Sequence, residues 1–223
     1  MNPVERQYKK FFEDWEAQGP VKIGPMSSSI WRTDPKSVFI KLSRYKFVSK
    51  LVQGKDEVLE IGCGDGWASS LVMKEVGKLT LSDIDPIWSE SVSNLYGENV
   101  SFEQIDFTNT LPDKTYDAIY ALDVLEHIDP KDSPRFCSNV AKSLRDSGLA
   151  LIGMPSLESQ LYASEVSKAG HVNCMSGDTL KSHLSVYFTN VFVFSMNDEV
   201  VHTGFYGMSH YLIALCLGAK KQS

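Results

Sequence analysis

The chain has 223 residues, of which 43% are hydrophobic, and it carries a formal net charge of −6 at pH 7. This length suits one sizeable α/β domain. The net negative charge gives no indication of a nucleic-acid partner, which would favour a basic surface. The sequence has no apolar run long enough to span a membrane, no secretory apolar stretch in residues 1–12 and no C-x-x-C pairing of its cysteines. We therefore expect a cytoplasmic protein with reduced thiols.

The N-terminal part predicts a helical arm ahead of the core. Residues 3–17 carry apolar side chains at helical spacing, at Val4, Tyr8, Phe11, Phe12 and Trp15. Residues 18–35 are rich in Gly, Pro and Ser and predict a loop, yet they contain Met26, Ile30 and Trp31. Residues 36–52 predict a second helix. We assign residues 1–53 to this arm, which either packs on the core as a strap or covers the site as a lid.

The centre of the chain is a buried strand that ends in a glycine-rich turn. Residues 57–61 predict the strand, Gly62-Cys63-Gly64-Asp65-Gly66 form the turn, and residues 67–76 predict a helix. Glycines allow a close approach of backbone to ligand, and a helix N-terminus offers unpaired N–H groups, so this unit predicts a nucleotide-sized pocket.

The residues around this turn favour a cationic ligand. The dinucleotide-binding motif G-x-G-x-x-G needs glycine or alanine at its third glycine position, whereas this chain has Trp67 there. Glu60 precedes the glycines, where we expect its carboxylate to face the ligand, and together with Asp65 it would repel a pyrophosphate. A sulfonium or ammonium ligand would be attracted, which favours S-adenosylmethionine over NAD.

Two further strands end in acidic residues. Residues 78–82 predict a strand that ends at Asp83, followed by Ile84, Asp85 and Pro86. Asp83 lies roughly 20 residues beyond the glycines, where α/β nucleotide folds place an acid on the ribose hydroxyls. The alternative is that Asp83 or Asp85 only caps a helix. Residues 100–105 predict the next strand, which ends at Asp106, a residue that alternatively faces solvent in a loop.

The rest of the chain continues the alternation of strands and helices. Strands are predicted at residues 116–121 and 149–154, helices at 133–144 and 176–184, and a terminal hairpin at 187–196 and 205–217. This order predicts a parallel α/β sheet that is closed by an antiparallel hairpin.

Together these features resemble the class I S-adenosylmethionine-dependent methyltransferases of small-molecule type. Residues 60–66 resemble motif I of that family, and residues 116–119 resemble its fourth strand, whose end reaches the transferable methyl group. The resemblance covers roughly residues 57–220. It implies a Rossmann-like, doubly wound, seven-stranded and mostly parallel sheet with a C-terminal antiparallel hairpin in a domain of residues 54–223.

The resemblance also implies which residues hold the cofactor, S-adenosylmethionine. Asp83 would bind the ribose, Asp106 would meet the adenine amino group, and Phe107 would flank the adenine ring. The full set of expected cofactor-binding residues is Glu60, Gly62, Cys63, Gly64, Asp83, Ile84, Asp106, Phe107 and Asp123.

Two histidines are candidate catalytic residues. His127 and His171 both follow strand ends, and histidine is the usual general base near neutral pH, although a loop histidine is more often a surface or capping group. Asp123, Glu126 and His127 form a D-x-x-E-H cluster. It resembles the E-x-x-E-H sequence of some ubiquinone-pathway and small-RNA methyltransferases, which bind a divalent metal there. If this chain did the same, His171 would be the natural further ligand. Because Asp123 is one methylene shorter than that pattern and similar letters occur without metal, we assign no metal ligand, and whether these four residues hold a metal is left open.

The sequence therefore predicts methyl transfer from S-adenosylmethionine to an oxygen or nitrogen of a small-molecule acceptor. A catalytically inactive nucleotide-binding module that serves as a partner subunit is the alternative. An NAD-dependent oxidoreductase is disfavoured by Trp67. The acceptor, its reacting atom and the oligomeric state are left open.

Overall fold

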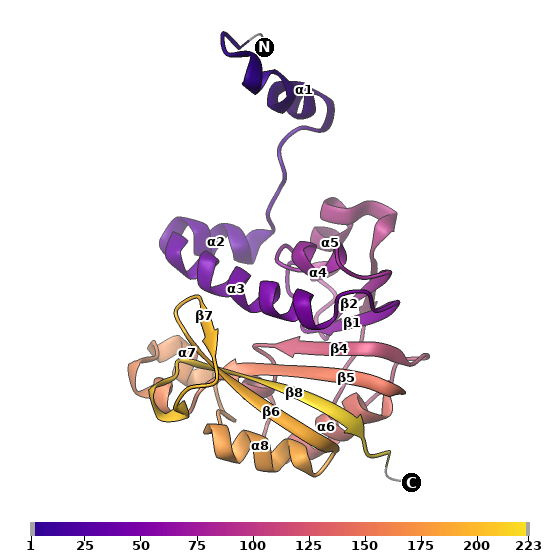
Figure 1. Cartoon of the computed structure of the whole chain (residues 1–223), viewed down its shortest axis with the longest axis vertical. Helices are drawn as coiled ribbons and strands as arrows, with labels where there is room; N and C mark the ends of the chain where they lie inside the picture. Colours follow the sequence, from indigo (N-terminus) through magenta and orange to yellow (C-terminus); the bar gives the residue numbers. More distant parts are fainter. Residues whose placement is uncertain (1–2, 222–223) are drawn as a thin grey trace.

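The computed structural model of the chain describes residues 3–221, which form one sheet with helices on both faces and a separate N-terminal segment (Figure 1). The strands are β1 Glu57–Ile61, β2 Lys78–Asp83, β3 Ser101–Gln104, β4 Tyr116–Leu122, β5 Leu144–Pro155, β6 Phe188–Asn197, β7 Val200–His202 and β8 Tyr211–Ala219. The α-helices are α1 Lys9–Gln18, α2 Pro25–Thr33, α3 Pro35–Leu51, α4 Ser70–Met73, α5 Trp88–Tyr96, α6 Ser133–Lys142, α7 Glu165–Gly170 and α8 Gly177–Ser185. Short 3-10 helices are η1 Arg6–Tyr8, η2 Gly97–Asn99, η3 Leu125–His127, η4 Glu158–Tyr162 and η5 Tyr206–Met208.

The strand order of the sheet is β3-β2-β1-β4-β5-β8-β6-β7. Strands β1 to β5 pair in parallel, and β8 is inserted antiparallel between β5 and β6. The chain runs outward from β1 to β3 and then returns to β4 on the other side of β1. Ligands in such sheets bind outside the carboxyl ends of the strands, at this switch point. The predicted doubly wound, mostly parallel sheet is confirmed.

Both faces of the sheet are covered, because the central strands are apolar on both sides. Leu59 and Ile119 belong to the core cluster that α6 and α8 complete on one face. Val58 and Tyr120 belong to the cluster that α3, α4 and α5 complete on the other face. This arrangement is the one expected of buried parallel strands, and it leaves the strand ends as the accessible part of the sheet.

The sheet has eight strands, whereas the sequence predicted seven. The additional strand β7 pairs with β6 through a tight turn, in which Asn197 lies opposite Val200. Asp198 in this turn has a φ of 48°, a backbone conformation that Asp tolerates better than most residues. The predicted polar turn between the hairpin strands therefore contains a short strand of its own.

Residues 18–35 were predicted as a loop, and this prediction is wrong for their second half, which forms α2. Pro25 occupies the first turn, where its fixed φ and missing N–H are tolerated. The next helix, α3, begins immediately afterwards at Pro35, and the carboxylate of Asp34 accepts a hydrogen bond from the backbone N–H of Lys36. The helix α2 was thus concealed by its own helix-breaking residues, whereas α3 lies where the second helix was predicted.

The helix predicted at residues 67–76 is also shorter than expected. Only Ser70–Met73 is α-helical. The backbone before it makes tight turns, in which Ser69 N–H donates to Gly66 C=O and Ser70 N–H donates to Trp67 C=O. The side-chain hydroxyl of Tyr96 donates a further hydrogen bond to Gly66 C=O at 2.6 Å, which anchors the turn to α5.

The helix α1 lies apart from the sheet, to which residues 19–24 connect it as an extended segment (Figure 1). We expected its aromatic face to be buried, but Phe11 and Trp15 are 69% and 52% exposed. The part of the arm that reaches the core is therefore α2 and α3. Within residues 3–221, no helix combines the length and the apolar character required to cross a bilayer.

Candidate functional site

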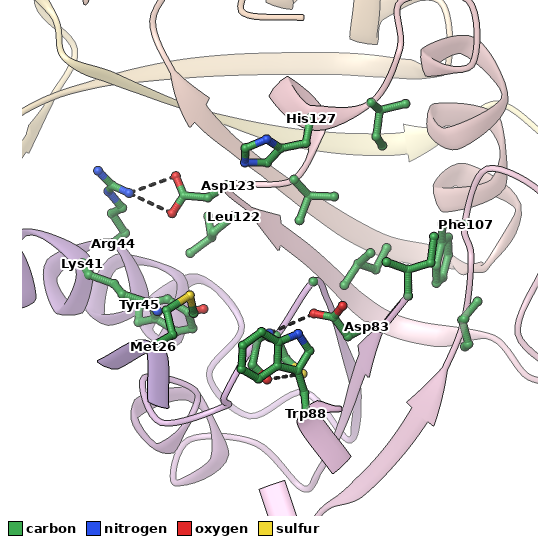
Figure 2. A pocket seen from close by; sticks show the side chains of 18 of the residues that line it. Met26, Lys41, Arg44, Tyr45, Asp83, Trp88, Phe107, Leu122, Asp123 and His127 are labelled. Carbon is green, nitrogen blue, oxygen red and sulfur yellow. Dashed lines mark hydrogen bonds and ion pairs between the residues drawn. The ribbon is translucent and has the colours of Figure 1, made fainter. Parts of the chain in front are cut away.

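A cavity of about 750 Å³ opens at the carboxyl ends of β1, β2 and β4, on the side that α2 and α3 border (Figure 2). Its size falls in the range of small-molecule and cofactor sites. Eight of the nine predicted cofactor-binding residues line it, namely Gly62, Cys63, Gly64, Asp83, Ile84, Asp106, Phe107 and Asp123. Its position is the one that the strand order predicts for a ligand.

The glycine turn forms the floor of the cavity. Gly62 and Gly64 have φ values of 74° and 54°, which L side chains rarely adopt. A Cβ atom on Gly62 would overlap the side chain of Val124, and one on Gly64 would lie 2.6 Å from the Cε of Met26. The turn is therefore pressed between β4 and α2, and glycine is required there for space as well as for backbone conformation.

This double requirement gives a testable difference between two glycines. Gly62→Ala is expected to lower the free energy of unfolding by about 1–3 kcal/mol more than Gly54→Ala, because only the first variant adds overlap with a neighbouring side chain. Gly54 is the matched control, since its φ is 75° and nothing lies within 4 Å of a Cβ there. Urea denaturation of both variants measures the difference, and equal losses would contradict the tight packing of Val124 on the turn.

Glu60 does not line the cavity, although its carboxylate was expected to face the ligand. Its side chain lies in the interior between β1 and α3 and is 1% exposed. Its oxygens accept hydrogen bonds from the hydroxyls of Tyr45 at 2.7 Å, Ser69 at 2.5 Å and Tyr120 at 2.5 Å. Burial raises the pKa of Glu60, against the effect of these three donors. The carboxyl group thus ties α3 to the glycine turn and does not line the cavity.

Asp65 likewise points away from the cavity. Its two oxygens accept hydrogen bonds from the backbone N–H and the hydroxyl of Ser27, at 2.6 and 2.9 Å. Because Ser27 lies in the first turn of α2, this acid fastens the N-terminal end of that helix to the glycine turn. Met26 and Ile30 of α2 consequently line the cavity.

The two acids of β2 and β3 lie at the cavity. Asp83 accepts hydrogen bonds from the backbone N–H groups of Gly64 and Asp85, both at 3.0 Å, and so links the glycine turn to the loop after β2. The side chain of Asp85 accepts from Ile87 N–H at 3.1 Å in the turn that precedes α5, and it makes no cap hydrogen bond to that helix.

Asp106 lies at the next strand end. Its carboxylate accepts from the hydroxyl and N–H of Thr108 and from the side chain of Asn109, and the Thr108 hydroxyl contributes most to lowering the pKa of Asp106. The ring of Phe107 packs against that of Phe136, with a centroid distance of 6.3 Å. An acid and an aromatic ring therefore lie side by side at the cavity.

Asp123 adopts a left-handed backbone conformation directly after β4. Its φ is 58°, a conformation that Asp tolerates better than most residues. Both oxygens lie against Nη1 of Arg44, at 3.0 and 2.9 Å (Figure 2). The Arg44 guanidinium carbon lies 3.7 Å above the centre of the Tyr211 ring.

The sequence prediction missed Arg44 together with Met26, Lys41 and Trp88, which also line the cavity. The helical period gave one signal that could have found part of this set. Ser37, Ile40, Lys41 and Arg44 share one face of α3, and all four line the cavity. Which face of the helix turns to the site is decided by packing that is distant in the sequence.

His127 and His171 come together, although 43 residues separate them in the chain. Their ring centroids lie 5.1 Å apart. His127 is one of the residues that line the cavity, whereas His171 is not. Asn173 brings the two segments together, because its N–H donates to Glu126 C=O at 3.0 Å and its side chain donates to Leu125 C=O at 3.2 Å.

Each of the two imidazoles uses its Nδ1 atom in a hydrogen bond within the protein. Nδ1 of His127 lies 2.9 Å from Gly170 C=O, and Nδ1 of His171 lies 2.9 Å from Oε1 of Gln160. Since both partners are acceptors, each Nδ1 is the donor, and in the neutral form of either ring Nε2 carries the lone pair. Burial, followed by the nearby His127, lowers the pKa of His171, which favours the neutral ring.

Glu126 completes a group that fits a divalent cation. One ligand atom each from Glu126, His127 and His171 lies within 4.8 Å of the other two. Glu126 is fully buried, and neither carboxylate oxygen has a hydrogen-bond partner within the described part of the chain. Burial, reinforced by the Asp123 carboxylate, raises the pKa of Glu126 to about 9. Imidazoles oriented by carbonyl groups next to a carboxyl group are a common donor set for divalent metals. Asp123, the first acid of the D-x-x-E-H cluster, is not part of this group.

Comparison with known proteins agrees with this geometry. Residues 33–186 match the family model described as "Methyltransferase domain". The chain belongs to this methyltransferase family. The prediction of a class I S-adenosylmethionine-dependent methyltransferase is confirmed, and S-adenosylmethionine is its cofactor. The alternative of an inactive nucleotide-binding module gains no support.

Individual relatives are distant. The chain is 26% identical to a ubiquinone biosynthesis O-methyltransferase of Rickettsia felis over 58% of its own length and 52% of that protein. It is 31% identical to a probable S-adenosylmethionine-dependent methyltransferase, Rv3030, of Mycobacterium tuberculosis over 44% of its own length and 35% of that protein. The chain thus spans about half or less of these curated relatives.

Solved structures share the fold. The N-methyltransferase NodS from Bradyrhizobium japonicum WM9, in complex with S-adenosyl-L-homocysteine, superposes with a TM-score of 0.60 at 16% identity, over 96% of this chain and 99% of that one. The methyltransferase domain of bacterial CtHen1 superposes with a TM-score of 0.64 at 18% identity, over 81% of this chain and 100% of that domain.

Proposed function

We propose that this methyltransferase transfers the methyl group of S-adenosylmethionine to an oxygen of a small-molecule acceptor, which binds at the His127 side of the cavity. The observation that carries the proposal is the convergence of Glu126, His127 and His171 immediately beyond β4. This places groups that can accept a proton or bind a hydroxyl next to the glycine turn of the cofactor site.

The cofactor side of the cavity supports the position of the methyl donor. The ribose would lie at Asp83, and the adenine would lie between Asp106 and Phe107, all of which line the cavity. The sulfonium would then lie above the glycine turn of β1. In this position its methyl group faces the end of β4 and the acceptor.

The reaction is an in-line displacement, for which the protein must mainly position the acceptor and remove its proton. An oxygen lone pair forms the new bond to the methyl carbon as the carbon–sulfur bond breaks, and the sulfur keeps the electron pair. The Nε2 atom of His127 carries a lone pair and takes the hydroxyl proton. The apolar walls at Ile40, Val124 and Ile128 exclude water from the reacting atoms.

The donor set also fits a divalent cation. Glu126 and the Nε2 atoms of His127 and His171 would hold it, and it would polarise an acceptor oxygen and favour its deprotonated form. His127 would then act as a ligand in place of a base. This feature favours an oxygen acceptor over a nitrogen acceptor, and the printed name of the Rickettsia relative, an O-methyltransferase, is consistent with it.

A transfer assay with S-[methyl-³H]adenosylmethionine tests this proposal. A panel of phenols, catechols, carboxylic acids and primary amines is offered to the wild-type protein, and we expect label on the oxygen acceptors. Parallel reactions with a chelator or with added Mn²⁺ separate the two roles of His127, because only the metal-dependent mode responds to chelation. Label on amines alone would contradict the proposal.

A further inference from the structure

We propose that β6 pairs with β6 of a second copy of this chain, antiparallel to it and about a two-fold axis, so that two sheets join into one. The contact uses residues 188–194, which form an open edge of the sheet. None of these residues lines the methyl-transfer cavity, so the pairing is independent of the proposed acceptor.

The open edge results from the short length of β7. On one side β6 pairs with β8 along residues 188–196, whereas on the other side β7 pairs only with Ser195, Met196 and Asn197. Within residues 3–221, the stretch 188–194 therefore has a second edge without a partner strand. The outward backbone N–H and C=O groups of such an edge are a template for another strand.

The composition of this stretch does not protect the edge. Natural sheets discourage edge pairing with short edge strands, charged side chains or proline. The opposite edge strand, β3, has four residues and includes Glu103, and β7 has three residues. Residues 188–194 read Phe-Thr-Asn-Val-Phe-Val-Phe, with no charged residue and no proline. Such β-branched and aromatic residues favour strand pairing.

Apolar side chains next to the open edge lie on a part of the sheet that no helix of the described chain covers. Phe192 is 54% exposed, and Leu215 and Leu217 on the neighbouring β8 are only partly buried. The helix α3 packs against β6 further along, at Phe194, whose ring centre lies 5.0 Å from that of Phe47. Figure 1 shows β6 and β8 without a helix in front of them where the open edge lies. A second copy at this edge would shield these side chains from water.

An antiparallel edge is complementary to itself, which makes a second copy of the chain the partner that fits. In a two-fold interface, a contact of residue i with residue j is matched by a contact of j with i. Residues 188–194 are centred on Val191, so pairing of the whole stretch places Asn190 opposite Phe192 of the second copy. Both positions belong to the uncovered face, because side chains alternate along a strand. The two Phe192 residues are then diagonal neighbours at about 7–8 Å, a distance that aromatic side chains bridge.

Sedimentation velocity of the whole chain, without cofactor or acceptor, tests this interface. The wild type is expected to sediment as a dimer at micromolar concentrations, with twice the chain mass of 24.9 kDa. Two double variants separate the proposed pairing from other contacts. In Asn190→Lys/Phe192→Lys, like charges lie opposite each other in both cross-strand pairs, whereas in Asn190→Glu/Phe192→Lys opposite charges do. Since both positions are exposed in a single copy, both variants are expected to fold.

We expect the Lys–Lys variant to dimerise about 30-fold or more weakly than the Glu–Lys variant, because two facing pairs change from attraction to repulsion. Ile87→Lys is the matched control, since Ile87 is 63% exposed and follows β2 on the opposite half of the sheet. Its dimerisation should stay within about twofold of the wild type, as for other surface substitutions. Phe192→Lys alone should weaken the wild-type dimer about tenfold, and it replaces the comparison if a double variant folds poorly.

A wild type that stays monomeric at these concentrations would overturn the interface. Equal dimerisation by the two double variants would overturn it as well, since the charges would then not face each other. Their melting temperatures, which should agree, show that a difference in mass does not come from unfolding. Because neither cofactor nor acceptor is present, failure of the oxygen-transfer assay leaves this result unaffected, and a monomeric protein that methylates oxygen would refute the interface alone.

Discussion

Replacement of His127 by alanine is expected to lower methyl transfer by about 10²–10⁴-fold, the range that a general base contributes. Its imidazole is the one of the candidate pair that lines the cavity, and its free Nε2 is set by the hydrogen bond of Nδ1 to Gly170 C=O. Steady-state turnover with the best acceptor of the panel measures the effect. Binding of S-adenosylhomocysteine should change by less than about threefold, since the glycine turn, Asp83 and Asp106 are untouched.

The control for this prediction is His210→Ala, which removes an exposed imidazole that does not line the cavity. It should leave turnover within about twofold of the wild type, as surface substitutions usually do. A His127→Ala variant that retains wild-type turnover would show that the acceptor proton leaves by another route and that the histidine pair serves only the structure of the loop.

The second large effect is expected at the ribose site. Asp83→Ala should weaken binding of S-adenosylhomocysteine by about 10- to 100-fold, because hydrogen bonds to a charged group are worth about 1.5–3 kcal/mol each. The variant also releases Gly64 N–H and Asp85 N–H, which the Asp83 carboxylate binds at 3.0 Å. Calorimetric titration measures the affinity.

Asp85→Ala provides the comparison for Asp83→Ala. Its side chain accepts one hydrogen bond from Ile87 N–H at the start of α5 and does not line the cavity. We expect its affinity for S-adenosylhomocysteine to stay within about threefold of the wild type, with a loss of about 0.5–1.5 kcal/mol in stability for the lost hydrogen bond. Equal affinities of the two variants would mean that the ribose is not bound at the end of β2.

The sequence predicted the sheet well because the strands carry strong local signals. The strand at residues 57–61 has the predicted bounds, and the acids at the ends of β2 and β3 line the cavity. Asp83 and Asp106 follow directly from where their strands end. The position of a residue at the end of a strand depends on where strands and helices alternate along the chain. The spacing of apolar residues in the sequence reveals that alternation.

The direction of individual side chains was less predictable. Glu60 lies next to the glycine turn in sequence, yet the pleat of β1 sends its side chain to the face that α3 covers. The hydroxyls of Tyr45, Ser69 and Tyr120 donate hydrogen bonds to its carboxylate there. Since those partners come from three other segments, no local pattern distinguishes a ligand-facing acid from this buried one.

Contacts between distant segments account for the other differences. The helix α2 exists although residues 18–35 contain breakers, because Asp65 binds Ser27 and Met26 packs on the glycine turn. The pairing of Arg44 with Asp123 joins residues that are 79 positions apart. The approach of His171 to Glu126 depends on the hydrogen bonds of Asn173, which no sequence period records.

The most direct test of the central claim, that the methyl donor and the acceptor groups meet in this one cavity, is a crystal structure of the protein with bound S-adenosylhomocysteine. We predict the adenine against Phe107, the ribose hydroxyls on Asp83, and the sulfur atom above Gly62 and Gly64 with its open side toward His127. A complex in which the sulfur faces away from His127, or in which the ligand lies outside this cavity, would contradict the account.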